Sequence, residues 1–124
     1  MQTSFFFRFH VEGDPDPRLV SIASWGPPWY KGRCYKALAP RKAMLKMDEA
    51  TYREHFQKIL DKLDPAKVAA DLGPNAILLC WEPPGKFCHR RLVAAWLEEH
   101  LGKPILEIGD NERQGNLFLE GREA

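Results

Sequence analysis

The stretch between residues 76 and 101 constrains the fold more than any other part of the chain. It begins with an apolar run, Ala76 to Cys80, that is too short for a helix and has no polar alternation. Such a run is typical of a strand buried on both faces in a parallel sheet. After a Pro-Pro-Gly breaker, apolar side chains recur at helical spacing from Leu92 to Leu101, and a Gly-Lys-Pro sequence ends the pattern. The stretch therefore predicts a strand, a loop and a helix, with Cys88 at the start of the helix.

The rest of the chain repeats this alternation of apolar strands and amphipathic helices. Further strands are predicted at Ser4–Phe9, Leu19–Ala23 and Pro104–Ile108. Two helices are predicted between residues 48 and 72, the first capped by Asp48 or Thr51 and the second by Asp64-Pro65. We therefore expect an α/β fold with a mainly parallel sheet flanked by helices, as one small domain over residues 1–124.

Composition limits the function classes. Eighteen basic and seventeen acidic residues give a formal charge of +1, which argues against a protein that coats a polyanion. No apolar run approaches the ~20 residues of a membrane span, and the N-terminal sequence lacks the features of a signal peptide. We expect a cytoplasmic protein. Its three cysteines, Cys34, Cys80 and Cys88, are then mostly reduced, with packing, metal binding or thiol chemistry as their roles.

The motif C-W-E-x5-C-H-R-R-L-V-A-x-W-L, from Cys80 to Leu97, resembles that of the bacterial and archaeal domain-of-unknown-function 488 family. In that family a Cys-x-Glu after a strand is followed by Cys-His-Arg at a helix start. The resemblance covers most of the chain, because it extends to Ser21-Ile22-Ala23, Pro28-Trp29-Tyr30-Lys31-Gly32, Leu38-Ala39-Pro40 and Glu107. It implies the location of a site and does not name a reaction.

The residues around the helix start are candidates for a catalytic site. A thiolate at a helix N-terminus is stabilised by unpaired N–H groups and the helix dipole, so Cys88 is a candidate nucleophile. His89, Arg90 and Arg91 are candidate ligand contacts beside it. The alternative for Cys88 is a packing role, since free cysteines are commonly small core residues.

The loop before this helix adds two further candidates. Glu82 is a candidate general base, or it shapes the loop by an ion pair with Arg90 or Arg91. Cys80 is a candidate pocket wall or ligand contact, and it can also form a redox couple with Cys88, although their spacing is not that of a C-x-x-C motif. A zinc site made of Cys80, Cys88 and His89 is a further alternative, for which no fourth ligand is visible in the sequence.

A second loop, from Trp25 to Arg33, combines aromatic and basic side chains. This composition suits a planar, anionic ligand such as a nucleotide, which would be bound by stacking and charge. The candidate ligand contacts are Trp25, Trp29, Tyr30 and Lys31. Alternatively, the aromatic rings only hold a long connection onto the core. Because both loops follow strands of a predicted parallel sheet, we expect them to line one pocket at the carboxyl edge.

The sequence does not support a dinucleotide enzyme, a P-loop NTPase or an α/β-hydrolase, because it contains no G-x-G-x-x-G, G-x-x-x-x-G-K-[ST] or G-x-S-x-G motif. The leading hypothesis is a small enzyme that acts on an anionic, nucleotide-like ligand, with Cys88 and Glu82 as chemical groups. The alternatives are a non-catalytic module that binds nucleotides or nucleic acid, and a metal-binding interaction protein.

Overall fold

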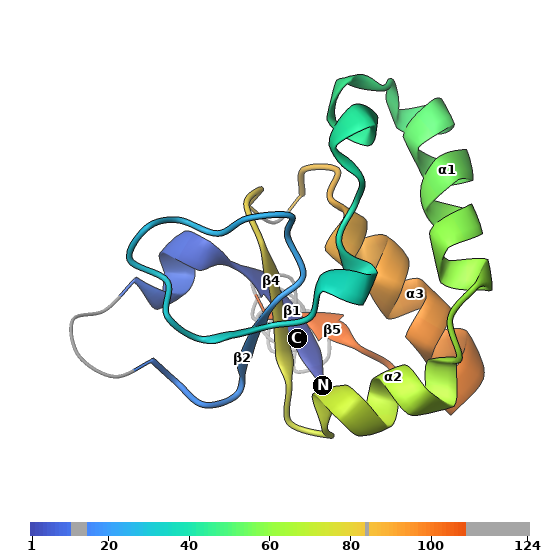
Figure 1. Cartoon of the computed structure of the whole chain (residues 1–124). Helices are drawn as coiled ribbons and strands as arrows, with labels where there is room; N and C mark the ends of the chain where they lie inside the picture. Colours follow the sequence, from blue (N-terminus) through green and yellow to red (C-terminus); the bar gives the residue numbers. More distant parts are fainter. Residues whose placement is uncertain (11–14, 84, 109–124) are drawn as a thin grey trace, which may run out of the picture.

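A parallel five-stranded sheet forms the centre of the fold. The computed structural model describes residues 1–10, 15–83 and 85–108 (Figure 1). Within these residues the strands lie in the order β3-β2-β4-β1-β5, and every pairing is parallel. The strands are β1 (Gln2–Phe5), β2 (Leu19–Ser21), β3 (Arg33–Cys34), β4 (Ile77–Cys80) and β5 (Leu106–Glu107). The prediction of an α/β fold with a mainly parallel sheet is confirmed.

Strand β4 is the central strand, as its sequence indicates. Its register places Phe5 of β1 opposite Cys80 on one side and Ser21 of β2 opposite Leu79 on the other. All four residues of β4 are buried, because neighbouring strands flank both edges and other parts of the chain cover both faces. The lack of polar alternation in this run therefore reports a strand with no solvent-facing side.

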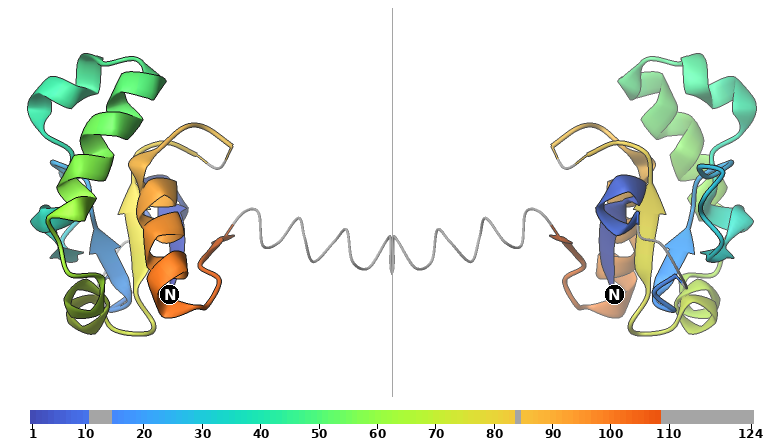
Figure 2. Two further views of the ribbon diagram at one scale, coloured as in Figure 1. Left: turned by 90° about the vertical axis from the view of Figure 1, so that its right-hand side faces the viewer. Right: turned by 90° about the vertical axis from the view of Figure 1, so that its left-hand side faces the viewer.

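Three α-helices lie together beside one face of the sheet (Figures 1 and 2). They are α1 (Glu49–Asp61), α2 (Pro65–Leu72) and α3 (His89–Leu101). The Asp48 side chain caps α1 by accepting a hydrogen bond from the Thr51 amide at 2.8 Å. Asp64 caps α2 in the same way through the Ala66 amide at 3.0 Å. Both predicted helices and both caps are confirmed, so local sequence signals decide where these helices begin.

The core has two parts, one on each face of the sheet. The helical face packs apolar side chains of α1, α2 and α3 against Val20 and Leu78. Trp96 is only 7 % exposed and belongs to this part, as do Leu97 and the half-buried Leu92, so the predicted core stripe of α3 is confirmed. The other face is covered by aromatic loop residues rather than by α-helices, and the cluster there includes Phe6, Ile77, Leu79, Trp29, Tyr30 and Trp81. Cys80 and Cys88 join this cluster from the end of β4 and the start of α3.

The first strand is shorter than predicted. A single strand over residues 4–9 is wrong, because β1 ends at Phe5 and a 3-10 helix, η1 (Phe6–Phe9), follows. Phe6 is fully buried, and its ring contacts Tyr30 and Trp81 with centroids at 5.2 and 5.3 Å. Turning the chain at this point places Phe6 in the aromatic cluster, a requirement that the apolar sequence does not reveal.

The other differences concern short elements. Strand β3 was not predicted, and neither were the 3-10 helices η2 (Lys36–Leu38) and η3 (Lys42–Lys46). Both helices lie in the basic region, residues 36–46, which contains Lys36, Arg41, Lys42 and Lys46. The Gly-Asp-Pro-Asp-Pro sequence at residues 13–17 predicts a turn, and its first two residues lie outside the described residues, as does the apolar sequence Leu117-Phe118-Leu119 in the polar tail. Among the described residues, none of the helices is long and apolar enough to cross a membrane.

Candidate functional site

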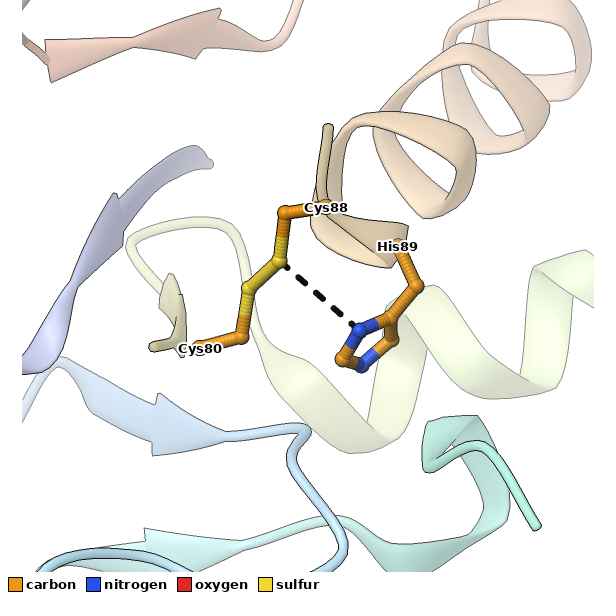
Figure 3. A group of neighbouring side chains, drawn as sticks. All are labelled: Cys80, Cys88 and His89. Atoms are coloured by element: carbon orange, nitrogen blue, oxygen red, sulfur yellow. Dashed lines mark hydrogen bonds between the residues drawn. A yellow bond between two sulfur atoms is a disulfide. The ribbon is translucent and has the colours of Figure 1, made fainter. Parts of the chain in front are cut away.

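The end of β4 and the start of α3 bring two cysteines together. Cys80 is the last residue of the strand, and Cys88 is the N-cap of the helix. Their Sγ atoms face each other and are joined as a disulfide, with Cα atoms 7.3 Å apart (Figure 3). The expectation that the cysteines are mostly reduced is therefore not met for Cys80 and Cys88 in this structure. The redox couple considered from the sequence is therefore geometrically available.

His89 completes a compact cluster with the two sulfur atoms. Its Nε2 lies 2.6 Å from the carbonyl oxygen of Ile22 and donates a hydrogen bond to it, since a carbonyl oxygen can only accept one. Its Nδ1 lies 3.8 Å from the Sγ of Cys88 (Figure 3). Burial lowers the pKa of His89 to about 4 and outweighs the hydrogen bond to Ile22, which raises it; the Arg90 charge makes a smaller contribution that also lowers it. The ring is therefore neutral at pH 7, and its Nδ1 lone pair faces Cys88.

Arg90 is fully buried and bridges two partners. Its Nε and Nη2 donate hydrogen bonds to the Glu107 carboxylate at 2.9 and 2.6 Å, and its Nη1 lies 3.0 Å from the Sγ of Cys80. The pKa of Glu107 is raised by burial, but hydrogen bonds from Arg90 and Thr3 outweigh that effect and hold it below its ordinary value. The pair is consequently ionised, and one guanidinium edge remains directed at a cysteine sulfur.

The carboxylate partner of Arg90 differs from the one considered in the sequence analysis. The ion pair found for Arg90 goes to Glu107 rather than to Glu82. Arg91 also points away from Glu82, since its Nη1 donates to the Thr3 hydroxyl and to the Ile105 carbonyl, both at 2.9 Å. The two arginines tie α3 to β1 and β5. The signal that could have located their partner is a glutamate inside an otherwise apolar strand.

The cysteine cluster opens into a cleft of about 220 Å³. The cleft is lined by residues of the loop after β2, residues 40–47, α1, the end of β4, the loop before α3 and the start of α3. They are Ala23, Ser24, Trp25, Pro40, Leu45, Met47, Tyr52, Cys80, Trp81, Glu82, Phe87, Cys88 and His89. The predicted meeting of the loops after Ala23 and after Cys80 is confirmed. A hydrogen bond from the Trp81 indole to the Trp25 carbonyl at 3.0 Å also joins them.

The candidates of the aromatic loop separate into two groups. Trp25 lines the cleft and is 55 % exposed. Trp29 stacks on His10 at 4.2 Å, and Tyr30 packs on Phe6 and donates its hydroxyl to the Arg33 carbonyl at 2.6 Å. Lys31 is exposed and does not line the cleft. The alternative of aromatic rings that hold the loop onto the core thus describes Trp29 and Tyr30, whereas Trp25 is available to a ligand.

Glu82 is an exposed residue at the cleft, with its Oε2 3.8 Å from the Sγ of Cys80. Tyr52 was interpreted from its spacing as part of the helical scaffold, yet it also lines the cleft opposite Glu82. Burial, with the charge of Glu82, raises the pKa of Tyr52 above its ordinary range. The sequence places Tyr52 in the first turn of α1, but it does not show that this turn lies at the cleft. That placement depends on how α1 packs in the tertiary structure.

Comparison of this chain with protein-family models, with curated proteins and with solved structures gives no match.

Proposed function

We propose that the protein is a small thiol-dependent enzyme that acts on a planar, anionic, nucleotide-like ligand bound in the cleft. The observation that carries this proposal is the contact of the Arg90 guanidinium with the Sγ of Cys80 at 3.0 Å, at the inner wall of the cleft. A hydrogen bond from a charged donor stabilises a thiolate, which is the nucleophilic form of cysteine. Cys80 is therefore our candidate nucleophile, in place of Cys88.

Cys88 supplies the second half of the chemistry. In the reduced protein the Cys80 thiolate would attack a disulfide sulfur of an oxidised substrate and displace the other sulfur as a thiolate. The Cys88 thiolate would then attack Cys80, form the Cys80–Cys88 disulfide and release the remaining substrate sulfur as a second thiolate. The substrate gains two electrons, and two equivalents of a small-molecule thiol of the cytoplasm would restore the dithiol and become a disulfide themselves. The neutral Nδ1 of His89 can accept a hydrogen bond from the Cys88 thiol and orient it, and the Glu82 carboxylate can exchange protons with the substrate.

The lining of the cleft favours a ligand with a flat apolar part. Trp25, Tyr52 and Phe87 supply aromatic surface, and the start of α3 has no side-chain cap on its amide groups. Uncapped amides at a helix start attract anionic groups such as phosphate. A cytoplasmic location would suit this proposal, because thiols are kept reduced there.

The first experiment measures the reactivity of each cysteine. The reduced protein is treated with iodoacetamide at pH 7, with a chelator present, and the modified cysteines are quantified by peptide mass spectrometry. We expect Cys80 to react faster in the folded protein than in the urea-unfolded chain, with exposed Cys34 as the internal control. A charged hydrogen bond contributes about 1.5–3 kcal/mol, so Arg90→Lys, which loses the guanidinium fork, should slow Cys80 by roughly 10–100-fold. Equal rates in the folded and unfolded chains would refute the proposal.

The second experiment tests the ligand class. Adenosine 5′-monophosphate should protect Cys80 from alkylation in the wild-type protein, and Trp25→Ala should weaken that protection without slowing alkylation itself. Protection that is unchanged in Trp25→Ala would show that the ligand does not occupy this cleft.

A non-catalytic nucleotide-binding module is the second candidate, favoured by the exposed indole of Trp25 at the cleft. It predicts that adenosine 5′-monophosphate binds Cys80→Ser as tightly as wild type and that Cys80 has the reactivity of an ordinary thiol. The alkylation rates therefore separate the two candidates.

A further inference from the structure

We infer that the reduced form of the cleft binds one zinc ion through Cys80, Cys88 and His89, and that this ion blocks the thiols. The inference deepens the proposed function, on which it rests, because it gives the same site a metal-bound resting form. The ligand atoms of these three residues all lie within 4.8 Å of one another, and all three residues are buried.

The donor set matches the metal. Two thiolate sulfurs and one imidazole nitrogen are the ligands that zinc prefers, and a Cys₂His set with an open fourth position is typical of catalytic zinc. The Cα atoms of the cysteines are 7.3 Å apart, beyond the ~4.4–6.8 Å usual for a disulfide. A backbone spacing of this size leaves room for a bridging ion between the two sulfurs once they are reduced.

The surroundings of the ligands are also those of a metal site. The Nε2 proton of His89 is donated to the Ile22 carbonyl, which fixes the ring and leaves Nδ1 as the ligand atom beside Cys88. Arg90 donates to the Sγ of Cys80, and its own charge is balanced by Glu107. The charges of two thiolates and one divalent ion then sum to zero, so the zinc-bound site places no unpaired charge in the interior.

The cleft supplies the fourth position. Glu82 lines it with its Oε2 3.8 Å from the Sγ of Cys80, so either this carboxylate or a bound ligand can complete a tetrahedral set. Zinc held there would occupy both sulfurs and prevent their attack on a substrate.

The experiment titrates the reduced, metal-stripped full chain with zinc and with cobalt(II) in the absence of oxygen. We expect one equivalent of zinc to bind, to protect Cys80 and Cys88 from iodoacetamide and to leave Cys34 reactive. Cobalt should give the sulfur-to-metal charge-transfer band of thiolate ligation. Binding well below one equivalent, or zinc that fails to protect the two cysteines, would overturn the inference.

The variants separate specific binding from general thiol affinity. Cys88→Ser should fold, because serine is a good N-cap residue, and it should weaken zinc binding by more than the ~10–100-fold typical of losing an outer-shell partner. His89→Gln should weaken it as well, whereas the matched control Cys34→Ser should bind zinc as wild type does. Loss of binding in Cys34→Ser, or its persistence in both Cys88→Ser and His89→Gln, would refute the site.

The two proposals fail in distinguishable ways. Fast alkylation of Cys80 in chelator together with no zinc binding would remove the zinc site and keep the enzyme. Ordinary alkylation together with one tightly bound zinc would remove the enzyme and leave a metal centre.

Discussion

The first turn of α3 has two sides that serve different purposes. Cys88 and His89 face the cleft, whereas Arg90 and Arg91 reach into a buried layer between α3, β1 and β5. Successive helical residues point about 100° apart, so neighbours in sequence contact different parts of the fold. Residues that are adjacent in sequence therefore need not form a single site: Cys88 and His89 belong to the cleft, Arg91 to the structural layer, and Arg90 reaches from that layer to the Cys80 sulfur.

The largest expected effect breaks the structural side. Glu107→Ala leaves the Arg90 guanidinium buried without its ionic partner, which costs about 3–5 kcal/mol of unfolding free energy. Urea unfolding followed by circular dichroism measures this loss. The matched control is Glu82→Ala on the cleft side, which should change stability by no more than about 0.5 kcal/mol. Equal losses in the two variants would mean that both sides are structural.

A pH series sharpens the same comparison. The folded pKa of Glu107 lies below its ordinary value of 4.5, so the stabilisation is complete above that value and is lost as the pH falls through the folded pKa. Glu107→Gln lacks this titration. The difference in unfolding free energy between wild type and Glu107→Gln should therefore be largest near pH 7 and shrink below about pH 4.5, as measured by urea unfolding. A difference that grows in acid would mean that Glu107 is not held as a carboxylate.

The smallest expected effect lies on the cleft side. Trp25 is 55 % exposed, so Trp25→Ala should change the unfolding free energy by about 0.5 kcal/mol or less, in contrast to the buried Trp96. Urea unfolding of both alanine variants tests this, with a loss of about 3–5 kcal/mol expected for Trp96→Ala. A large loss in Trp25→Ala would make this ring part of the core and remove it from the proposed ligand surface.

Local patterns were sufficient for most of the fold. The apolar run of β4, the caps Asp48 and Asp64 and the stripe of α3 each carry a short-range signal, since periodicity and capping depend on a few neighbouring residues. The short pieces were harder to predict. Phe6 turns the chain out of β1 because of partners that are distant in sequence, and the two-residue strand β3 has almost no pattern of its own.

By itself, the sequence determined the parallel α/β architecture and the place of the candidate site, because a buried strand followed by a breaker and an amphipathic helix has few other solutions. Only the tertiary structure decided which side chains form that site. It paired Arg90 with Glu107, directed the free guanidinium edge at Cys80, and turned Trp25 into the cleft while packing Trp29 and Tyr30 on Phe6. The physical reason is that buried charges and rings must find partners, and those partners lie far away along the chain.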